Sequence, residues 1–283
     1  MTFMSLPMLN DGLSPGNFAR LAQLVESYSG IHLPAEKKYM VEGRLRRRAQ
    51  ALALSSLDAY CDALFEQGLW GDELVSLIDA ITTNKTEFFR ERPHFRILGE
   101  QVLPEFVGAG PRRPLRFWSA ACANGAEAYS AAMLMDDFAG DHPGLRFQIV
   151  ATDICSAVLR EAKMAVFDRE MMAPVPADYQ KRYVMFPVDS GDRTVRMKPS
   201  LRQAVSFGRV NLMDPSYPLA EKQDVIFCRN LLIYFTRDRQ EMVLRRLCDH
   251  LNQGGYLFIS HTENIMGMKL PVRQMAPSVF QRL

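Results

Sequence analysis

Apolar residues in the first third of the chain recur at intervals of three and four positions, the spacing of amphipathic helices. The first predicted helix begins at Ser14 and Pro15, which offer a cap and a first-turn proline, and it ends at Gly30. Further helices are predicted to begin near Pro34, Ser56 and Asp72. We therefore expect residues 1–92 to form a small all-helical domain.

The pattern changes after a helix that begins near Pro93 and a connector rich in glycine and proline at residues 108–114. Apolar runs of strand length follow at 115–121, 145–151, 224–230 and 256–260. Helical spacing separates them, at 126–138, at 156–163 and in a long segment that stops at Gly254 and Gly255. Such alternation is typical of a mostly parallel sheet with helices on both faces, so residues 93–283 are predicted to form an α/β domain.

Residues 183–208 interrupt this alternation. The segment holds short strand-like runs on both sides of an Asp-Ser-Gly-Asp turn. Runs of this kind around a turn predict antiparallel pairing. We expect a small antiparallel β subdomain inserted into the α/β domain.

Composition and charge exclude several classes of protein. Lysine and arginine together number 34 against 32 aspartates and glutamates, a net charge of +2 that argues against a nucleic-acid partner. The five cysteines show no C-x-x-C spacing and the five histidines no H-E-x-x-H pattern, so we expect neither a disulfide framework nor a metal. The N-terminal stretch has no basic residue before its apolar part, and no apolar run reaches the length of a membrane span. We expect a cytoplasmic monomer that does not insert into a membrane.

The ends of the predicted strands carry the candidate chemistry, because ligands of open parallel sheets bind beyond the carboxyl ends of the strands. Gly125, Asp153, Asn211 and Asn230 each follow an apolar run. An aspartate there can bind ribose hydroxyls, and an asparagine can both donate to and accept from a ligand. Taken alone, Asp153 is explained better as a solvated or helix-capping aspartate, and a turn also explains each asparagine. Their convergence on one sheet edge favours a cofactor site.

Longer strings of residues resemble one protein family. ITTNKTEFFRE (81–91), WSAACANGAEAYS (118–130), ATDI (151–154), VNL (210–212), DVIFCRNLLIYF (224–235) and SHTEN (260–264) occur in the order and spacing of the CheR family. The family's members are S-adenosylmethionine-dependent methyltransferases that esterify glutamate side chains of bacterial chemotaxis receptors. The similarity covers nearly the whole chain from Phe18 onward, and it implies a Rossmann-like methyltransferase domain behind the helical one.

The resemblance also implies roles for individual residues. The family's contacts to S-adenosylmethionine, and to its product S-adenosylhomocysteine, fall on Asn84, Thr86, Arg90, Glu127, Asp153, Asn211, Leu212, Arg229 and Asn230. Arg90 and Tyr234 match positions that assist at the methyl-transfer centre, although a core aromatic side chain also explains Tyr234. Where the family usually has Gly-Glu-Glu-Pro-Tyr-Ser, this chain has alanine at positions 126 and 128. Because Glu127 is retained, we expect cofactor binding to be kept.

The implied chemistry needs no general base. A glutamate acceptor is already anionic at neutral pH, since its unperturbed pKa is about 4.3. This agrees with the lack of a conspicuous histidine or lysine base in the motifs. By the same resemblance, the partners are the cytoplasmic methylation helices of chemoreceptors. A receptor C-terminal peptide, which would bind the antiparallel subdomain, and a regulatory protein are further candidates.

A basic segment offers a candidate docking surface. Residues 36–50 hold six basic residues and two acidic ones. On a helix, Lys37, Arg44, Arg47 and Arg48 fall near one face, which could track an acidic receptor surface. An ordinary solvated helix face is the alternative.

Two other functions compete with receptor methylation. A nucleic-acid methyltransferase is disfavoured, because amine-methylating enzymes of that class resemble Asn-Pro-Pro-Tyr where this chain has Asn230-Leu-Leu-Ile. A catalytically weak cofactor sensor or scaffold in a chemosensory pathway is suggested only by Ala126 and Ala128.

Overall fold

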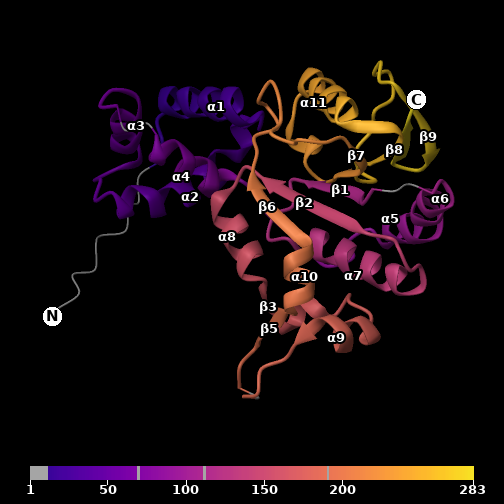
Figure 1. The fold of residues 1–283 in the computed structure, drawn as a ribbon. Helices are drawn as coiled ribbons and strands as arrows, with labels where there is room; N and C mark the ends of the chain where they lie inside the picture. Colours follow the sequence, from indigo (N-terminus) through magenta and orange to yellow (C-terminus); the bar gives the residue numbers. More distant parts are fainter. Residues whose placement is uncertain (1–11, 69–70, 111–112, 190) are drawn as a thin grey trace. The chain divides into compact units, whose positions relative to one another are not determined.

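The computed structural model describes residues 12–68, 71–110, 113–189 and 191–283, which form two compact units (Figure 1). The first unit contains the described residues up to Thr83 together with 234–236, and the second contains 84–233 and 237–283. The predicted helical domain extended to residue 92. Residues 84–92 belong to the second unit because Phe88 and Phe89 are buried in its core. The N-terminal stretch, residues 111 and 112 of the connector and Ser190 of the predicted turn lie outside the described residues.

The first unit is helical, as predicted. It comprises α1 (Pro15–Ser29), a 3-10 turn η1 (Ala35–Lys37), α2 (Lys38–Ala51), α3 (Leu57–Phe65) and α4 (Asp72–Ile81). Ser14 caps α1 by accepting a hydrogen bond from the backbone N–H of Asn17, and Gly30 ends the helix in the left-handed conformation. Apolar residues at helical spacing, including Leu21, Leu45 and Leu64, are fully buried in the unit.

The second unit is built on a seven-stranded sheet in the order β6-β2-β1-β7-β8-β10-β9. Its strands are β1 (Leu115–Ala120), β2 (Phe147–Asp153), β6 (Val205–Arg209), β7 (Gln223–Cys228), β8 (Leu251–Phe258), β9 (Val272–Ala276) and β10 (Val279–Arg282). The first five strands in the order are parallel, and the C-terminal hairpin β9–β10 is antiparallel. The predicted Rossmann-like architecture is confirmed, and the hairpin is an addition that the sequence did not predict.

Helices connect the parallel strands. The unit opens with α5 (Arg92–Ile97), a π-helical turn η2 (Leu98–Val102) and α6 (Leu103–Gly108). β1 leads into α7 (Ala126–Asp141), β2 into α8 (Ser156–Met164), and β7 through the 3-10 turn η4 (Leu232–Tyr234) into α11 (Arg237–Asp249). Figure 1 shows α7 and α11 on opposite sides of the sheet, as the predicted alternation requires. None of the described helices is long and apolar enough to cross a membrane.

The antiparallel subdomain differs in extent from the prediction of 183–208. Its sheet has the order β3-β5-β4, with β3 (Val166–Asp168), β4 (Val184–Met185) and β5 (Thr194–Met197), and it is accompanied by η3 (Arg169–Met172), α9 (Ala177–Tyr183) and α10 (Pro199–Ala204). It therefore starts 17 residues earlier, at Val166 of β3. Residues 205–208 belong instead to β6, which pairs in parallel with β2.

The two glycines expected to follow the long helix lie inside a strand. α11 ends at Asp249, and β8 already begins at Leu251 and contains Gly254 and Gly255. The register with β7 shifts beside them, between Gln223 and Val225. A Cβ on Gly255 would lie 2.9 Å from the carbonyl oxygen of Asn252, so the shifted strand requires glycine at this position.

Candidate cofactor site

Four neighbouring parallel strands end at the same edge of the sheet. Ala120 of β1 pairs with Thr152 of β2 and with Cys228 of β7, and Asp153 of β2 pairs with Arg209 of β6. The segments that follow these strands, 121–125, 154–155, 210–212 and 229–232, consequently start along one edge. The predicted convergence of the strand ends is confirmed.

The turn after β1 contains three residues in the left-handed backbone conformation. Ala121, Ala123 and Gly125 have φ angles of 67°, 48° and 86°. Left-handed conformations cost an alanine roughly 1–2 kcal/mol, and such strain is concentrated at functional sites. A Cβ on Gly125 would lie 3.1 Å from Ala162 and from Phe207, so only glycine lets this turn pack closely against its neighbours.

Asp153 holds this turn and the turn after β2. One carboxylate oxygen accepts a hydrogen bond from the backbone N–H of Ala123 and the other from that of Cys155, both at 2.9 Å. The residue is only 6% exposed. Because each carboxylate oxygen has two lone pairs, Asp153 retains acceptor capacity for the hydroxyl groups of a ligand.

The other predicted polar contacts near β2 and β6 lie in loops. Asn211 is buried, and its side-chain oxygen accepts from the N–H of Met213 at 3.0 Å. The carbonyl of Leu212 accepts from the hydroxyl of Tyr217. Asn84 lies 3.5 Å from the sulfur of Cys155, which brings the segment 84–87 to the end of β2. Thr86 is half-buried in that segment.

Arg229 lies at the centre of a buried ionic network. Its guanidinium, 1% exposed, donates to Glu127 at 2.9 Å, to Glu91 at 3.1 Å and to the carbonyl of Arg90. Ser119 donates to the second oxygen of Glu127 at 2.7 Å. Burial raises the pKa of Glu127, while Arg229 and Ser119 oppose that rise. Arg229 and Glu127 were predicted as cofactor contacts, and here each is bonded to protein groups that shape the site.

A second carboxylate, Glu263, holds the turn after β7. Its oxygens accept from the backbone N–H groups of Leu232 at 2.8 Å and of Ser260 at 2.7 Å. Burial raises the pKa of Glu263 to about 7, against the opposing effect of these backbone hydrogen bonds. Asn230 adopts a left-handed φ of 59° in the same turn. Glu263 therefore fixes the backbone that carries Asn230.

Sequence reasoning assigned no role to Glu91, Ser260 or Glu263. All three stand inside the strings FFRE and SHTEN that carried the family resemblance. The sequence signal for these residues was that each is a polar residue that interrupts or ends an apolar run within such a string. Their partners are brought close only by the fold.

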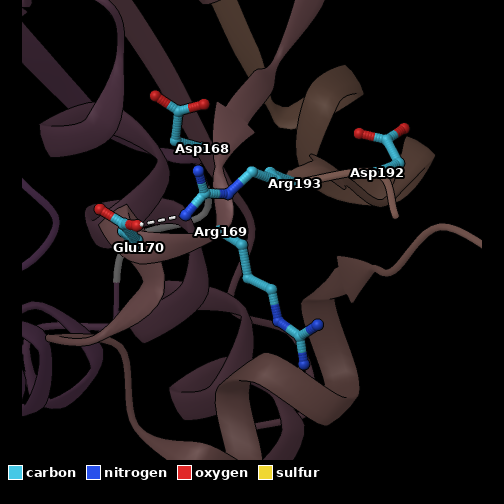
Figure 2. A pocket seen from close by; sticks show the side chains of 5 residues that line it. All are labelled: Asp168, Arg169, Glu170, Asp192 and Arg193. Carbon is cyan, nitrogen blue, oxygen red and sulfur yellow. Dashed lines mark hydrogen bonds and ion pairs between the residues drawn. The ribbon is translucent and has the colours of Figure 1, made fainter. Parts of the chain in front are cut away.

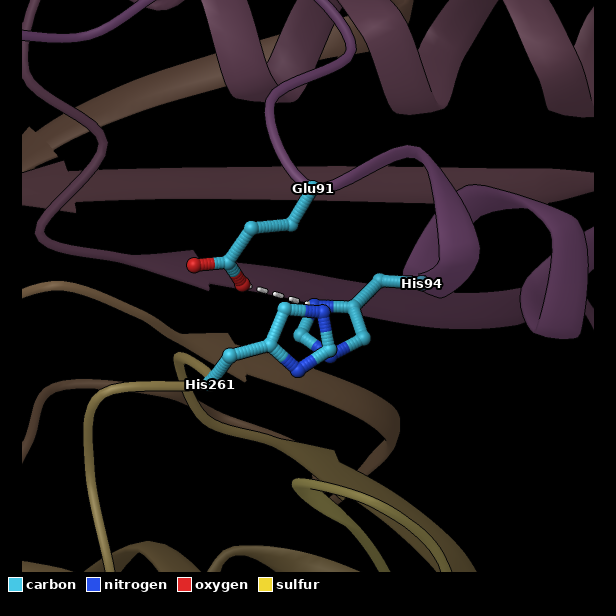
Figure 3. Close-up of side chains that lie close together, drawn as sticks. All are labelled: Glu91, His94 and His261. Carbon is cyan, nitrogen blue, oxygen red and sulfur yellow. Dashed lines mark ion pairs between the residues drawn. The ribbon is translucent and has the colours of Figure 1, made fainter.

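Glu91 also meets two histidines in a cluster whose residue types can bind metal ions (Figure 3). His94 is fully buried, with Nδ1 3.2 Å from Glu91 and Nε2 2.8 Å from the hydroxyl of Ser278, which is 2.9 Å from His261. Burial and the charge of Arg229 lower the pKa of His94 to about 3, so its ring is neutral. Both oxygens of Glu91 already accept hydrogen bonds, one of them from Arg229, whose positive charge would repel a cation. The geometry supports a hydrogen-bonded cluster better than a metal site.

The two predicted catalytic residues belong to different compact units. Arg90, in the second unit, is half-buried and donates to the carbonyl of Lys85 at 3.0 Å. Tyr234 belongs to the first unit, where its carbonyl accepts from the N–H of His32 at 2.8 Å and its ring centroid lies 5.3 Å from Nζ of Lys37. Tyr234 is not fully buried, unlike a typical core aromatic residue. Their joint role stays a prediction.

The basic residues of helix α2 do not all face solvent, as a docking surface would require. Arg44 donates to the carbonyls of Ile81 and Thr82 at the end of α4. Arg48 forms an ion pair with the buried carboxylate of Glu73. These guanidinium groups stabilise the helical unit, whereas Arg47 is exposed and Lys37 half-exposed. A docking role therefore concerns Arg47 and Lys37 first.

The start of α7 accommodates the two alanines that depart from the family pattern. The N–H of Ala126 donates to the side-chain oxygen of Asn124 at 3.2 Å, which satisfies one of the free donors of the first turn. Ala126 and Ala128 are both fully buried. Small side chains at these positions allow α7 to pack closely on the sheet.

A separate hollow of about 570 Å³ lies on the antiparallel subdomain (Figure 2). It is lined by Asp168, Arg169, Glu170, Asp192 and Arg193. Glu170 and Arg193 form an ion pair at 3.1 Å, but both side chains are more than 80% exposed, so the pair contributes little stability. The hollow holds charges of both signs and none of the predicted cofactor residues.

Comparison with known proteins connects this site to a family. A model described as "CheR methyltransferase, all-alpha domain" matches residues 16–82, and one described as "CheR methyltransferase, SAM binding domain" matches residues 84–280. The chain is 36% identical over 256 residues to the chemotaxis protein methyltransferase of Salmonella typhimurium, covering 90% of this chain and 86% of that one. It is 34% identical over 276 residues to chemotaxis protein methyltransferase 1 of Vibrio cholerae, covering 96% and 98%. For the corresponding protein of Borreliella burgdorferi the identity is 32% over 266 residues, covering 92% of each chain.

Proposed function

The chain belongs to the CheR methyltransferase family, and we propose that it transfers a methyl group from S-adenosylmethionine to glutamate side chains of bacterial chemoreceptors. The product is a glutamate methyl ester on the cytoplasmic part of the receptor, so the proposed place of action is the cytoplasm. The observation that carries the proposal is the carboxylate of Asp153, held by two backbone N–H groups at the common edge of four strands.

The residues at this edge fit the cofactor by the chemistry of their polar groups. Asp153 can accept from the ribose hydroxyls, and the amides of Asn84, Asn211 and Asn230 can donate or accept. Glu91 and Glu127 outnumber Arg229 and give the buried network a net negative formal charge, which suits a cofactor with sulfonium and ammonium groups. When bound, S-adenosylmethionine supplies the electrophilic methyl group.

The protein's own task is to position the acceptor and to exclude water. A receptor glutamate is anionic at neutral pH and needs no base to attack a methyl carbon. Two titratable groups near the site with strongly shifted pKa values, His94 and Glu263, agree with this, because His94 is buried and Glu263 is bonded to backbone. Arg90 is proposed to bind a carboxylate, and Tyr234 to donate a hydrogen bond at the transfer centre.

Receptor binding is proposed to use two basic residues of the helical unit, the exposed Arg47 and the half-exposed Lys37. Lys37 and Arg47 provide positive charge that favours association with glutamate-bearing receptor helices. The antiparallel subdomain is a second candidate surface, because β3 and β4 each have one strand partner in the sheet. An extended receptor peptide can pair with such an edge.

The experiment that tests the proposal is transfer from methyl-labelled S-adenosylmethionine to receptor-containing membranes. Wild-type protein is expected to label the receptor, and an Asp153→Asn variant is expected to do so far more slowly. Labelling should disappear when the receptor's acceptor glutamates are replaced by alanine. Cofactor binding without any transfer would identify a sensor or scaffold, and labelled nucleic acid would identify the other competing function.

A further inference from the structure

Ser260 connects the buried carboxylate of Glu91 to the side chain of Asn230. Its hydroxyl oxygen lies 2.6 Å from Glu91 Oε1 and 2.6 Å from Asn230 Nδ2. Ser260 is fully buried, and it follows the end of β8. The three residues come from three different loops at the same end of the second unit.

The number of available protons decides the direction of these hydrogen bonds. A carboxylate can only accept, and a hydroxyl has a single proton to donate. Although burial opposes ionisation, the hydrogen bond from Ser260 and the charge of Arg229 hold the pKa of Glu91 below its usual value, so the carboxylate is ionised at neutral pH. Ser260 therefore donates to Glu91 and accepts from Asn230.

This arrangement settles the orientation of the Asn230 amide. The reversed amide would place its oxygen against the oxygen of Ser260, whose proton already points to Glu91. The NH₂ group must face Ser260, and the amide oxygen faces away from it. That oxygen has no hydrogen-bond partner among the described residues, and Asn230 is half-buried at the edge where β7 ends.

The position of Asn230 in the sheet indicates which part of the cofactor it meets. β7 and β2 flank β1 on opposite sides, and β6 lies beyond β2. In S-adenosylmethionine the adenine and the amino-acid chain extend from opposite sides of the ribose. With the ribose at Asp153, one part points toward β6 and the other toward β7. The net negative charge of Arg229, Glu91 and Glu127 lies on the β7 side and favours the cationic amino-acid part there.

We propose that Glu91 and Ser260 are positioning residues that set the Asn230 amide oxygen as the acceptor for the α-ammonium group of the cofactor. The proposal rests on the proposed function for the identity of the cofactor. It adds two residues that touch no ligand and act through Asn230. Their effect is on selectivity among cofactor analogues as well as on affinity.

The test is calorimetric binding of S-adenosylhomocysteine and two analogues to the full chain. One analogue lacks the α-amino group, and the other has the adenine amino group replaced by oxygen. Wild-type protein is expected to bind S-adenosylhomocysteine about tenfold or more tightly than the analogue without the α-amino group, the usual effect of a hydrogen bond to a charged group. Two variants, Ser260→Ala and Glu91→Gln, are expected to lose most of this preference.

Glu91→Gln changes which groups donate and which accept in these hydrogen bonds. The glutamine oxygen is expected to accept from the cationic Arg229, which turns the glutamine NH₂ toward Ser260. The proton of Ser260 is then free to point at Asn230 or at the hydroxyl of Thr262, 3.2 Å away, so the Asn230 amide is no longer held in its wild-type orientation. The matched control is Ser278→Ala, which removes another buried hydroxyl of the cluster, bonded to His94 and His261 and not to Asn230. The control should keep the wild-type preference.

Each outcome bears on the proposal. Unchanged preference in both folded variants would overturn it, and so would an equal loss in Ser278→Ala, which would show a general effect of the cluster. If the variants change only the affinity for the analogue altered at adenine, the assignment of Asn230 to the ammonium group would be overturned. Wild-type protein that binds none of the three compounds would instead refute the proposed function itself. Thermal unfolding of each variant verifies that the fold is retained.

Discussion

Replacing Arg229 by methionine is expected to destabilise the protein more at pH 8 than at pH 5. The guanidinium of Arg229 is 1% exposed and is the cationic partner of both Glu91 and Glu127. Methionine has a similar reach and no charge, so the substitution leaves two buried carboxylates without their cation. Breaking a buried ion pair by removing one partner costs about 3–5 kcal/mol.

The pH dependence follows from the carboxylates. In the wild type, Ser260 and Arg229 hold the pKa of Glu91 below the ordinary 4.5, against the opposing effect of burial, so its ionised form stabilises the folded state. Without Arg229, burial dominates and raises the folded-state pKa of both carboxyls. A raised carboxyl pKa reduces stability as pH rises from the unfolded value through the folded one. The deficit of the variant therefore grows above about pH 4.5.

The assay is urea unfolding at the two pH values, followed by far-ultraviolet circular dichroism. Arg113→Met is the matched control, since Arg113 pairs with Asp224 but is 39% exposed. Asp224 also accepts from Asn252 and from the N–H of Arg116, so it keeps partners, and the expected loss is about 1 kcal/mol with little pH dependence. The reasoning would be refuted if Arg229→Met lost no more unfolding free energy than Arg113→Met, or if its loss were equal at both pH values.

Three further predictions concern binding and turnover. Asp153→Asn places an NH₂ group against a backbone donor of Ala123 or Cys155 and should weaken S-adenosylhomocysteine binding about tenfold or more; unchanged affinity in calorimetry contradicts the ribose assignment. Tyr234→Phe should lower kcat and leave product affinity intact, and normal turnover would make Tyr234 a packing residue. Exchanging Lys37 and Arg47 for glutamate should raise the KM for receptor, most strongly at low salt, without changing product affinity. A KM equal to that of the wild type across a salt series would show that the two residues form only a solvated face.

The helices and the parallel strands could be predicted because their apolar residues repeat with the period of the element they form. Leu21, Leu45 and Leu64 lie on buried helix faces, and the strand β7 is buried along its whole length. The hairpin β9–β10 could not be predicted in this way, because β9 has no fully buried residue and thus no periodic apolar signal. The strand β6 was recognised but assigned to the wrong sheet, since the choice between partners is made by tertiary packing.

Site residues could be predicted from the sequence where a single polar residue lies at or just after the end of a predicted strand. Asp153 and Asn230 were found in this way. Glu91 and Ser260 were not, because they are 169 positions apart and the hydrogen bond between them is a property of the fold. The same limit applies to Arg44 and Arg48, since a helical pattern shows which residues share a face but not which guanidinium groups bond back to the protein.

The most direct test of receptor-glutamate methylation is to locate the transferred methyl group. Receptor incubated with the protein and methyl-labelled S-adenosylmethionine is digested, and the labelled peptides are sequenced by mass spectrometry before and after treatment with base. Receptor-glutamate methylation predicts methyl groups on glutamate side chains that base releases as methanol. Base-stable label on lysine or at an amino terminus, or no label on receptor under conditions where the cofactor binds, would contradict it.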